Sequence, residues 1–153
     1  MHNYQIKDIT PKWKIQDPVA DSKVTGPESI YEMATEYYKA KELDPTKEHC
    51  VCAILDRAHQ VIGFNLVSTG SVSASIVHPR EVFKPAISLS ASAIILIHQH
   101  PSGELKESRQ DIEITKTIHE AGEILDIPLL DHIIISFQKD SYKSLREAGY
   151  LND

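Results

Sequence analysis

Apolar residues follow two different spacings along the chain, and these spacings predict the order of its helices and strands. After Pro27 they recur at helical spacing, so an amphipathic helix is expected from Pro27 to about Lys41. Proline suits the first turn of a helix because the amide hydrogen that it lacks has no helical partner there. Residues 50–55 and 61–67 are short, strand-forming segments, and the turn between them predicts a hairpin.

The middle of the chain predicts a helix followed by a buried strand. Pro79 is expected to open a helix that continues towards Ile87. Residues 93–97 form an unbroken aliphatic run, Ala-Ile-Ile-Leu-Ile, which is typical of a central strand covered on both faces.

The remaining segments predict a helix, a strand and a short final helix. The first helix is expected from about Ser108 to Ala121, with Gly122 at its C-terminal cap. Its inward-facing candidates are Ile112, Thr115, Ile118 and Ala121. Residues 129–136 predict the last strand, and residues 141–149 a terminal helix. The fold class is therefore mixed α/β (α+β-like), a sheet with helices packed on its faces.

Composition and charge narrow the classes of protein to which the chain can belong. Its 153 residues, 41% hydrophobic and 25% charged, suit one globular domain. A net charge of -6 argues against general attraction to nucleic acid. Lys12-Trp13-Lys14 places an aromatic ring between two cations and could stack on a base, but an anchored tryptophan with solvated neighbours is the simpler interpretation.

Location and redox state are predicted from what the sequence lacks. No apolar run approaches the roughly 20 residues of a membrane span. The N-terminus does not resemble a signal peptide. Cys50 and Cys52 lie two apart in an apolar strand, where disulfide geometry is poor, so buried free thiols are expected. These features predict a cytoplasmic protein.

The candidate chemistry lies directly after the aliphatic strand. His98 and His100 are two apart, so both imidazoles should project from one face of that strand. Pro101 then ends the strand because it cannot donate to a sheet. Asp111 falls in the first turn of the next helix, for which Ser108 is the natural cap. A strand end and a helix start joined by a short loop can bring these side chains to one point.

Two imidazoles and one carboxylate are ligands that suit zinc, with a further position left for water. Iron(II) accepts the same ligand types, so the metal is not determined by them alone. The simpler alternatives are that the histidines are solvated loop residues and that Asp111 only complements the helix dipole. Asp131 or His132 is a candidate partner for a ligand imidazole. A hydrogen bond within the fold is the simpler role for His132.

The string His98-x-His100-Pro101-Ser102-Gly103 followed by Ser108-x-x-Asp111 resembles the JAMM motif of the JAB1/MPN metallopeptidase superfamily, and most closely the bacterial RadC family. Residues 75–83, 131–135 and 144–147 are also similar to RadC proteins. The resemblance covers about residues 27–150. It divides the chain into an N-terminal extension, residues 1–26, and a RadC-like JAB/MPN domain, residues 27–153. It also implies the mixed sheet of MPN and cytidine-deaminase-like folds.

The resemblance implies a hydrolase that cleaves an amide, peptide or isopeptide bond in a peptide or protein substrate. His98, His100 and Asp111 would bind one zinc ion. Glu48, at the start of the first strand, would activate the water, and Ser108 would stabilise the oxyanion. Gln99 stands where an asparagine is expected between the histidines; it should point to the opposite sheet face and leave the ligands unaffected.

Two other functions stay open. RadC proteins are named for DNA repair, and the family carries an N-terminal helical region with a helix-hairpin-helix, for which residues 1–26 are too few. Direct nucleic-acid binding is therefore not expected, although a repair-associated nucleic-acid-binding module is one alternative. The other is a catalytically silent MPN interaction domain. Such domains usually lose motif residues, whereas all five motif positions are present here.

Overall fold

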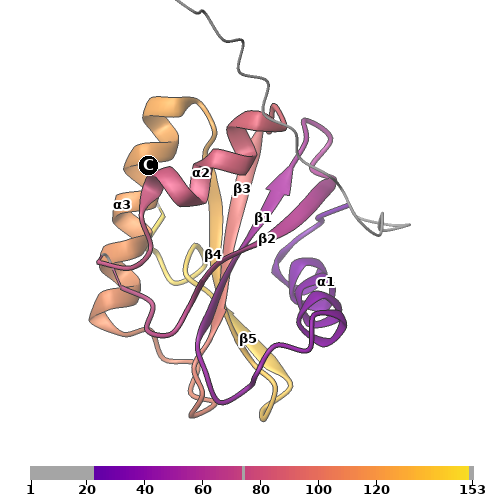
Figure 1. Ribbon diagram of the computed structural model, residues 1–153, viewed down its shortest axis with the longest axis vertical. Helices are drawn as coiled ribbons and strands as arrows, with labels where there is room; N and C mark the ends of the chain where they lie inside the picture. The colour runs from indigo at the N-terminus through magenta and orange to yellow at the C-terminus, as the bar shows by residue number, and fades with distance from the viewer. Residues whose placement is uncertain (1–22, 74, 152–153) are drawn as a thin grey trace, which may run out of the picture.

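The computed structural model describes residues 23–73 and 75–151, so Lys12-Trp13-Lys14 lies outside the described residues. The strands are β1 (His49–Leu55), β2 (Val61–Thr69), β3 (Ala93–Gln99), β4 (Leu129–Ser136) and β5 (Ser141–Ser144). The helices are α1 (Pro27–Ala40), α2 (Pro79–Ser88) and α3 (Arg109–Leu125). Together they form the mixed α/β fold that the sequence predicts (Figure 1).

The strands form one sheet in the order β2-β1-β3-β4-β5. The predicted hairpin pairs β1 with β2, and β1 is also antiparallel to β3. β3 and β4 are parallel, and α3 connects them. Every residue of β1 and β3 is buried, which explains why these two strands are almost wholly apolar.

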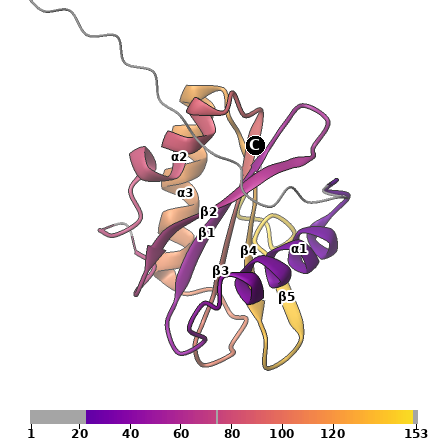
Figure 2. The ribbon, with the colours of Figure 1, turned by 45° about the vertical axis from the view of Figure 1, so that its right-hand side comes forward.

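The helices cover both faces of the sheet, α1 on one face and α2 with α3 on the other (Figures 1 and 2). Side chains of β3 alternate between these two layers. Ile94 and Leu96 belong to the core cluster that includes α2 and α3 residues, whereas Ile95 and Ile97 pack in the cluster with α1. By the same alternation, His98 faces the α3 side and Gln99 the α1 side.

The predicted first helix is confirmed as α1. Its buried residues, Ile30, Ala34 and Tyr38, are four apart and form one stripe against the sheet. The Tyr38 hydroxyl donates to the backbone oxygen of His49 at 2.7 Å. α1 therefore also contacts the start of β1, directly after Glu48.

The predicted end of α3 at Gly122 is wrong, because the helix continues to Leu125 and ends at Asp126 in a left-handed conformation. Gly122 is instead a buried residue within the helix. A Cβ atom there would lie 2.6 Å from the backbone oxygen of Ile127. The glycine thus allows the chain after the helix to pass closely over it.

The inward face of α3 is only partly as predicted. Thr115 and Ile118 are buried, whereas Ile112 and Ala121 are half-buried. Ile114 was missed by the sequence analysis and is fully buried.

The predicted helix over residues 141–149 is also wrong. Residues Ser141–Ser144 form β5, antiparallel to β4, and turns follow it. The Asp131 carboxylate stabilises this arrangement: it accepts from the Ser144 hydroxyl at 2.6 Å and from the Arg146 amide at 3.0 Å. Pairing with the edge of β4 gives the segment the backbone hydrogen bonds that a helix would have supplied.

Two expectations from composition agree with the structure. Cys50 and Cys52 are free and buried, and burial raises the pKa of the Cys50 thiol to about 12. Within the described residues, no helix combines the length and apolar character needed to cross a bilayer.

Candidate metal centre

The structure brings His98, His100 and Asp111 together where β3 ends and α3 begins. The two Nε2 atoms are 3.1 Å apart. Asp111 Oδ1 lies 3.1 Å from His98 Nε2, and Oδ2 lies 3.0 Å from His100 Nε2. His98 and Asp111 are buried and His100 is half-buried, so the centre is reached from the His100 side.

Asp111 is positioned by the capping box of α3. The Ser108 hydroxyl accepts from the Asp111 amide at 3.0 Å, and the Ser108 amide donates to Asp111 Oδ2 at 2.8 Å. The predicted cap is therefore confirmed. Because accepting a bond uses a lone pair, the hydroxyl hydrogen of the exposed Ser108 can still be donated to a substrate.

His100 is oriented by the loop that follows it. Its Nδ1 lies 2.8 Å from the backbone oxygen of Glu104, which can only accept. Nδ1 therefore carries the hydrogen, and Nε2 of the neutral ring presents its lone pair to the centre. When the ring is protonated, Nε2 can instead donate to Asp111, and this hydrogen bond raises the pKa of His100.

The centre favours a cation. Burial by itself would raise the pKa of Asp111, but hydrogen bonds from His100 and His98 outweigh it and hold that pKa well below its usual range. An ionised carboxylate and two imidazole nitrogens thus meet within about 3 Å of one another. Zinc bonds of about 2.0–2.1 Å in tetrahedral geometry place ligand atoms roughly 3.3 Å apart. The three side chains therefore fit one such ion.

His98 is held by a partner on the neighbouring parallel strand. Its Nδ1 lies 2.8 Å from His132 Nε2, and His132 Nδ1 lies 2.7 Å from the Thr115 hydroxyl. His132 is thus the candidate that contacts a ligand imidazole, whereas Asp131 is used by β5. Burial lowers the pKa of His132 well below its usual range, so its ring is neutral. The sequence analysis predicted Thr115 only as an inward-facing residue.

Glu48 lies at the edge of the same centre. One of its carboxylate oxygens is within 4.8 Å of the ligand nitrogens of His98 and His100, so these three residues could themselves hold a metal ion. Its Oε2 accepts from the Val72 amide at 2.9 Å, and its backbone oxygen accepts from the Gly70 amide at 2.8 Å. The loop after β2 therefore orients the Glu48 side chain.

Two carboxylates, Glu48 and Asp111, compete for the third ligand position. The separations of Asp111 from both imidazoles match those expected around a shared ion. A Glu48 carboxylate oxygen also lies within 4.8 Å of the ligand nitrogens of both histidines. Either carboxylate could therefore join the two imidazoles in holding a metal ion.

Gln99 faces away from the ligands, as predicted, but it has a role that the sequence analysis missed. Its Oε1 accepts from the His49 amide at 3.0 Å, and its Nε2 donates to the Lys47 backbone oxygen at 2.6 Å. These two backbone groups flank Glu48. Gln99 therefore connects the end of the ligand-bearing strand to the chain on either side of Glu48.

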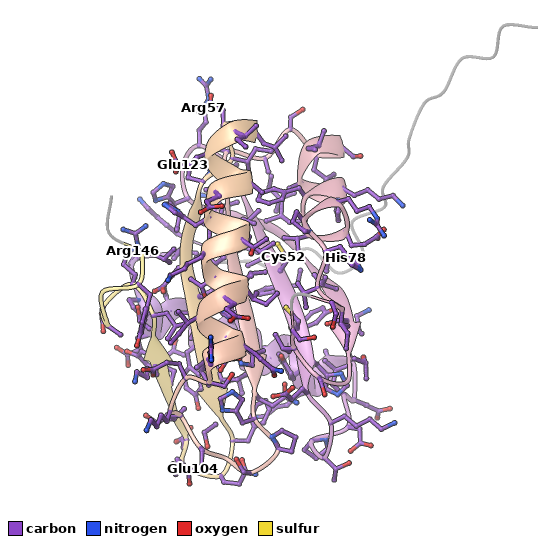
Figure 3. The ribbon with its side chains drawn as sticks, turned by 90° about the vertical axis from the view of Figure 1, so that its left-hand side faces the viewer. Cys52, Arg57, His78, Glu104, Glu123 and Arg146 are labelled. Carbon is purple, nitrogen blue, oxygen red and sulfur yellow. The ribbon has the colours of Figure 1, made fainter. Side chains whose placement is uncertain are left out.

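The loop from His100 to Ser108 is tied to the hairpin formed by β4 and β5. Lys139 Nζ donates to Glu104 at 3.3 Å, and Lys143 forms an ion pair with Glu107. Figure 3 shows Glu104 at one end of the molecule and Arg57, from the β1–β2 turn, at the other. The candidate centre thus lies at the Glu104 end, beside a loop that the β4–β5 hairpin anchors.

Comparison with known proteins shows the family to which the chain belongs. The family described as RadC-like JAB domain matches residues 24–150. The chain belongs to this family. A UPF0758 protein of Bacillus licheniformis is 53% identical over 106 residues, which cover 69% of the chain and 46% of that protein. The UPF0758 protein YsxA of Bacillus subtilis is 49% identical over 106 residues, which cover 69% of the chain and 45% of that protein.

A UPF0758 protein of Staphylococcus carnosus is 42% identical over 146 residues, 95% of the chain and 62% of that protein. This RadC-like JAB chain thus spans about half the length of the curated relatives it matches. The matched family span of residues 24–150 contains His98, His100, Asp111, Glu48 and Ser108.

Proposed function

We propose that the domain is a zinc-dependent hydrolase that cleaves an amide, peptide or isopeptide bond in a peptide or protein. The observation that carries this proposal is the convergence of two imidazole nitrogens and a carboxylate within about 3 Å, beside a second carboxylate that the fold orients separately. His98, His100 and Asp111 are the proposed ligands of one ion.

Each remaining residue has a chemical role in this proposal. Zinc, when bound, would polarise a water molecule and the carbonyl of the scissile bond. Glu48 accepts the proton of the attacking water and returns it to the leaving amine, a role worth typically 10²–10⁴ in rate. The Ser108 hydroxyl donates to the oxygen on which negative charge develops. The Val72 amide donates to Glu48 Oε2 and so orients the carboxylate that accepts the proton.

The arrangement supports hydrolysis over a silent binding domain. A carboxylate oriented beside two imidazoles at an accessible position is typical of a catalytic site, and binding a partner does not require it. The net charge of -6 disfavours general binding to phosphate backbones. Fold alone would not distinguish these functions, and the complete set of site residues is what supports hydrolysis.

Metal analysis and two variants test the proposal. The purified wild-type domain should hold one equivalent of zinc and cleave members of a mixture of short peptides and lysine-linked isopeptides. Glu48→Gln should keep the zinc and lose turnover, whereas His98→Ala should lose the zinc. Arg57→Ala, at the exposed far end of the domain, is the control. A fully loaded His98→Ala variant, or an unchanged turnover in Glu48→Gln, would contradict the assignment.

A further inference from the structure

A histidine binds a metal through a ring lone pair, so the nitrogen that carries its hydrogen decides whether His98 can act as a ligand. The neutral ring carries one hydrogen, on either Nδ1 or Nε2. His98 Nε2 faces His100 and Asp111, so metal binding requires the hydrogen on Nδ1. We propose that Thr115 and His132 are positioning residues that hold this hydrogen on Nδ1, an inference that rests on the proposed metal site.

The direction of the hydrogen bonds is decided at Thr115. Its hydroxyl lies 2.6 Å from the backbone oxygen of Asp111, and a carbonyl oxygen can only accept. The single hydroxyl hydrogen is therefore donated to Asp111. The hydroxyl oxygen then has only lone pairs to offer His132 Nδ1, which lies 2.7 Å away. His132 must donate from Nδ1.

The position of the hydrogen on His132 determines the position of the hydrogen on His98. A neutral His132 with its hydrogen on Nδ1 presents a lone pair at Nε2. That lone pair faces His98 Nδ1 at 2.8 Å, so His98 Nδ1 donates. In the neutral ring Nε2 is then the nitrogen with the lone pair. The three hydrogen bonds from His98 through His132 and Thr115 to the Asp111 carbonyl form a series. Each bond has one compatible direction because the last acceptor is a carbonyl oxygen.

Because these side chains are buried, reversing the direction of their hydrogen bonds would cost free energy. Thr115, His132 and His98 are all fully buried, so water does not offer a replacement partner. Reversing one bond would leave a buried donor facing a donor or a lone pair facing a lone pair, at a cost of about 1–3 kcal/mol. The series also connects two ligands, because it runs from the backbone of Asp111 to the ring of His98.

A helical threonine that bonds the carbonyl four residues earlier is common in proteins and needs no function. That explanation covers the bond from Thr115 to Asp111 but not the second bond, to His132 on another strand. The two ligand histidines also differ. His100 is oriented directly by the Glu104 carbonyl, whereas His98 reaches a carbonyl only through two intervening side chains.

A matched pair of substitutions tests the proposal. Thr115→Val keeps the branched shape and removes the hydroxyl, whereas Thr115→Ser keeps the hydroxyl and removes the methyl group. Zinc affinity is measured by competition with a chromogenic chelator. We expect Thr115→Val to bind zinc about 10–100-fold more weakly, the usual effect of losing a partner of a ligand histidine. Thr115→Ser should bind zinc almost as tightly as the wild type.

Nitrogen-15 NMR of the histidine rings in the zinc-free wild-type domain provides a second measurement that needs no variant. His98 and His132 should each carry a hydrogen on Nδ1, whether or not Asp111 also holds one on His98 Nε2. In Thr115→Val the His132 ring should shift towards a mixture of the two forms, and His98 should follow it.

The outcomes separate this inference from the proposed function. Absence of zinc binding by the wild type would remove the metal site itself. Normal wild-type binding with unchanged affinity in Thr115→Val would overturn only the role of Thr115. Equal weakening in both variants would assign the effect to packing and overturn it too. A wild-type His98 ring without a hydrogen on Nδ1 would also overturn it.

Discussion

The side-chain amide of Gln99 holds the backbone on both sides of Glu48. It accepts from the His49 amide and donates to the Lys47 oxygen, so the end of β3 and the start of β1 are joined at the residue proposed to transfer the proton. The proposed ligand His98 projects from the opposite face of the same strand. One strand end therefore positions both parts of the candidate centre.

Replacing Gln99 with methionine should destabilise the domain without removing its metal. Methionine fills a similar volume but makes neither hydrogen bond and leaves the buried His49 amide without its partner. We expect the free energy of unfolding to fall by about 1–3 kcal/mol. Urea denaturation and metal analysis measure the two effects. Gln110→Met, at an exposed position of α3, is the control. Unchanged stability of Gln99→Met would remove the proposed link to Glu48.

Two substitutions at Ser108 separate its capping bond from its proposed catalytic bond. Ser108→Ala should cost about 1 kcal/mol of stability, and Ser108→Gly only a few tenths, because glycine is tolerated at the N-cap. Both variants lose the hydroxyl, so hydrolysis should fall roughly 10²–10³-fold in each. Unfolding curves and turnover are compared for the same preparations. Full turnover in Ser108→Gly would leave Ser108 as a helix cap alone.

Gly122→Ala should destabilise the domain although alanine is the better helix former by about 1 kcal/mol. The added Cβ would lie 2.6 Å from the Ile127 oxygen and 3.3 Å from the Leu129 amide, so backbone has to move. Such crowding typically costs about 1–3 kcal/mol. Gly63→Ala, where a Cβ meets nothing within 4 Å, is the matched control. A more stable Gly122→Ala variant would show that the backbone at Ile127 and Leu129 can move away from position 122 at little cost.

Lys143→Met should lower stability in a pH-dependent manner. The hydrogen bond from Lys143 is the main cause of the lowered pKa of Glu107, whose ordinary value is 4.5. A lowered folded pKa means that the contribution is present above 4.5 and is lost as the pH falls below it. The difference from wild type, about 0.5–1 kcal/mol at pH 7, should therefore shrink in acid.

Urea denaturation at several pH values measures this difference. Lys116→Met, on the exposed side of α3, removes the same charge away from Glu107 and is the control. A difference that stays constant through the acid range would show that the ion pair does not stabilise the loop.

Local sequence pattern determined the features that are formed by residues close together along the chain. The stripe of α1 and the hairpin of β1 and β2 follow from spacing and turn residues alone. The grouping of His98, His100 and Asp111 is local as well, because two strand positions and the next helix start are separated by one short loop. The sequence could therefore predict their convergence before any packing was known.

Tertiary structure decided the features that depend on pairing between distant segments. Residues Ser141–Ser144 form a strand because the edge of β4 is available for pairing. Gly122 lies within α3, rather than at its end, where the chain after the helix folds closely over it. His132 meets His98 only through the parallel register of β3 and β4, and Gln99 meets the flanks of Glu48 only because β1 lies beside β3. Spacing along one segment carries no information about which residue of another segment will lie opposite it, and the ligand-orienting contacts depend on that register.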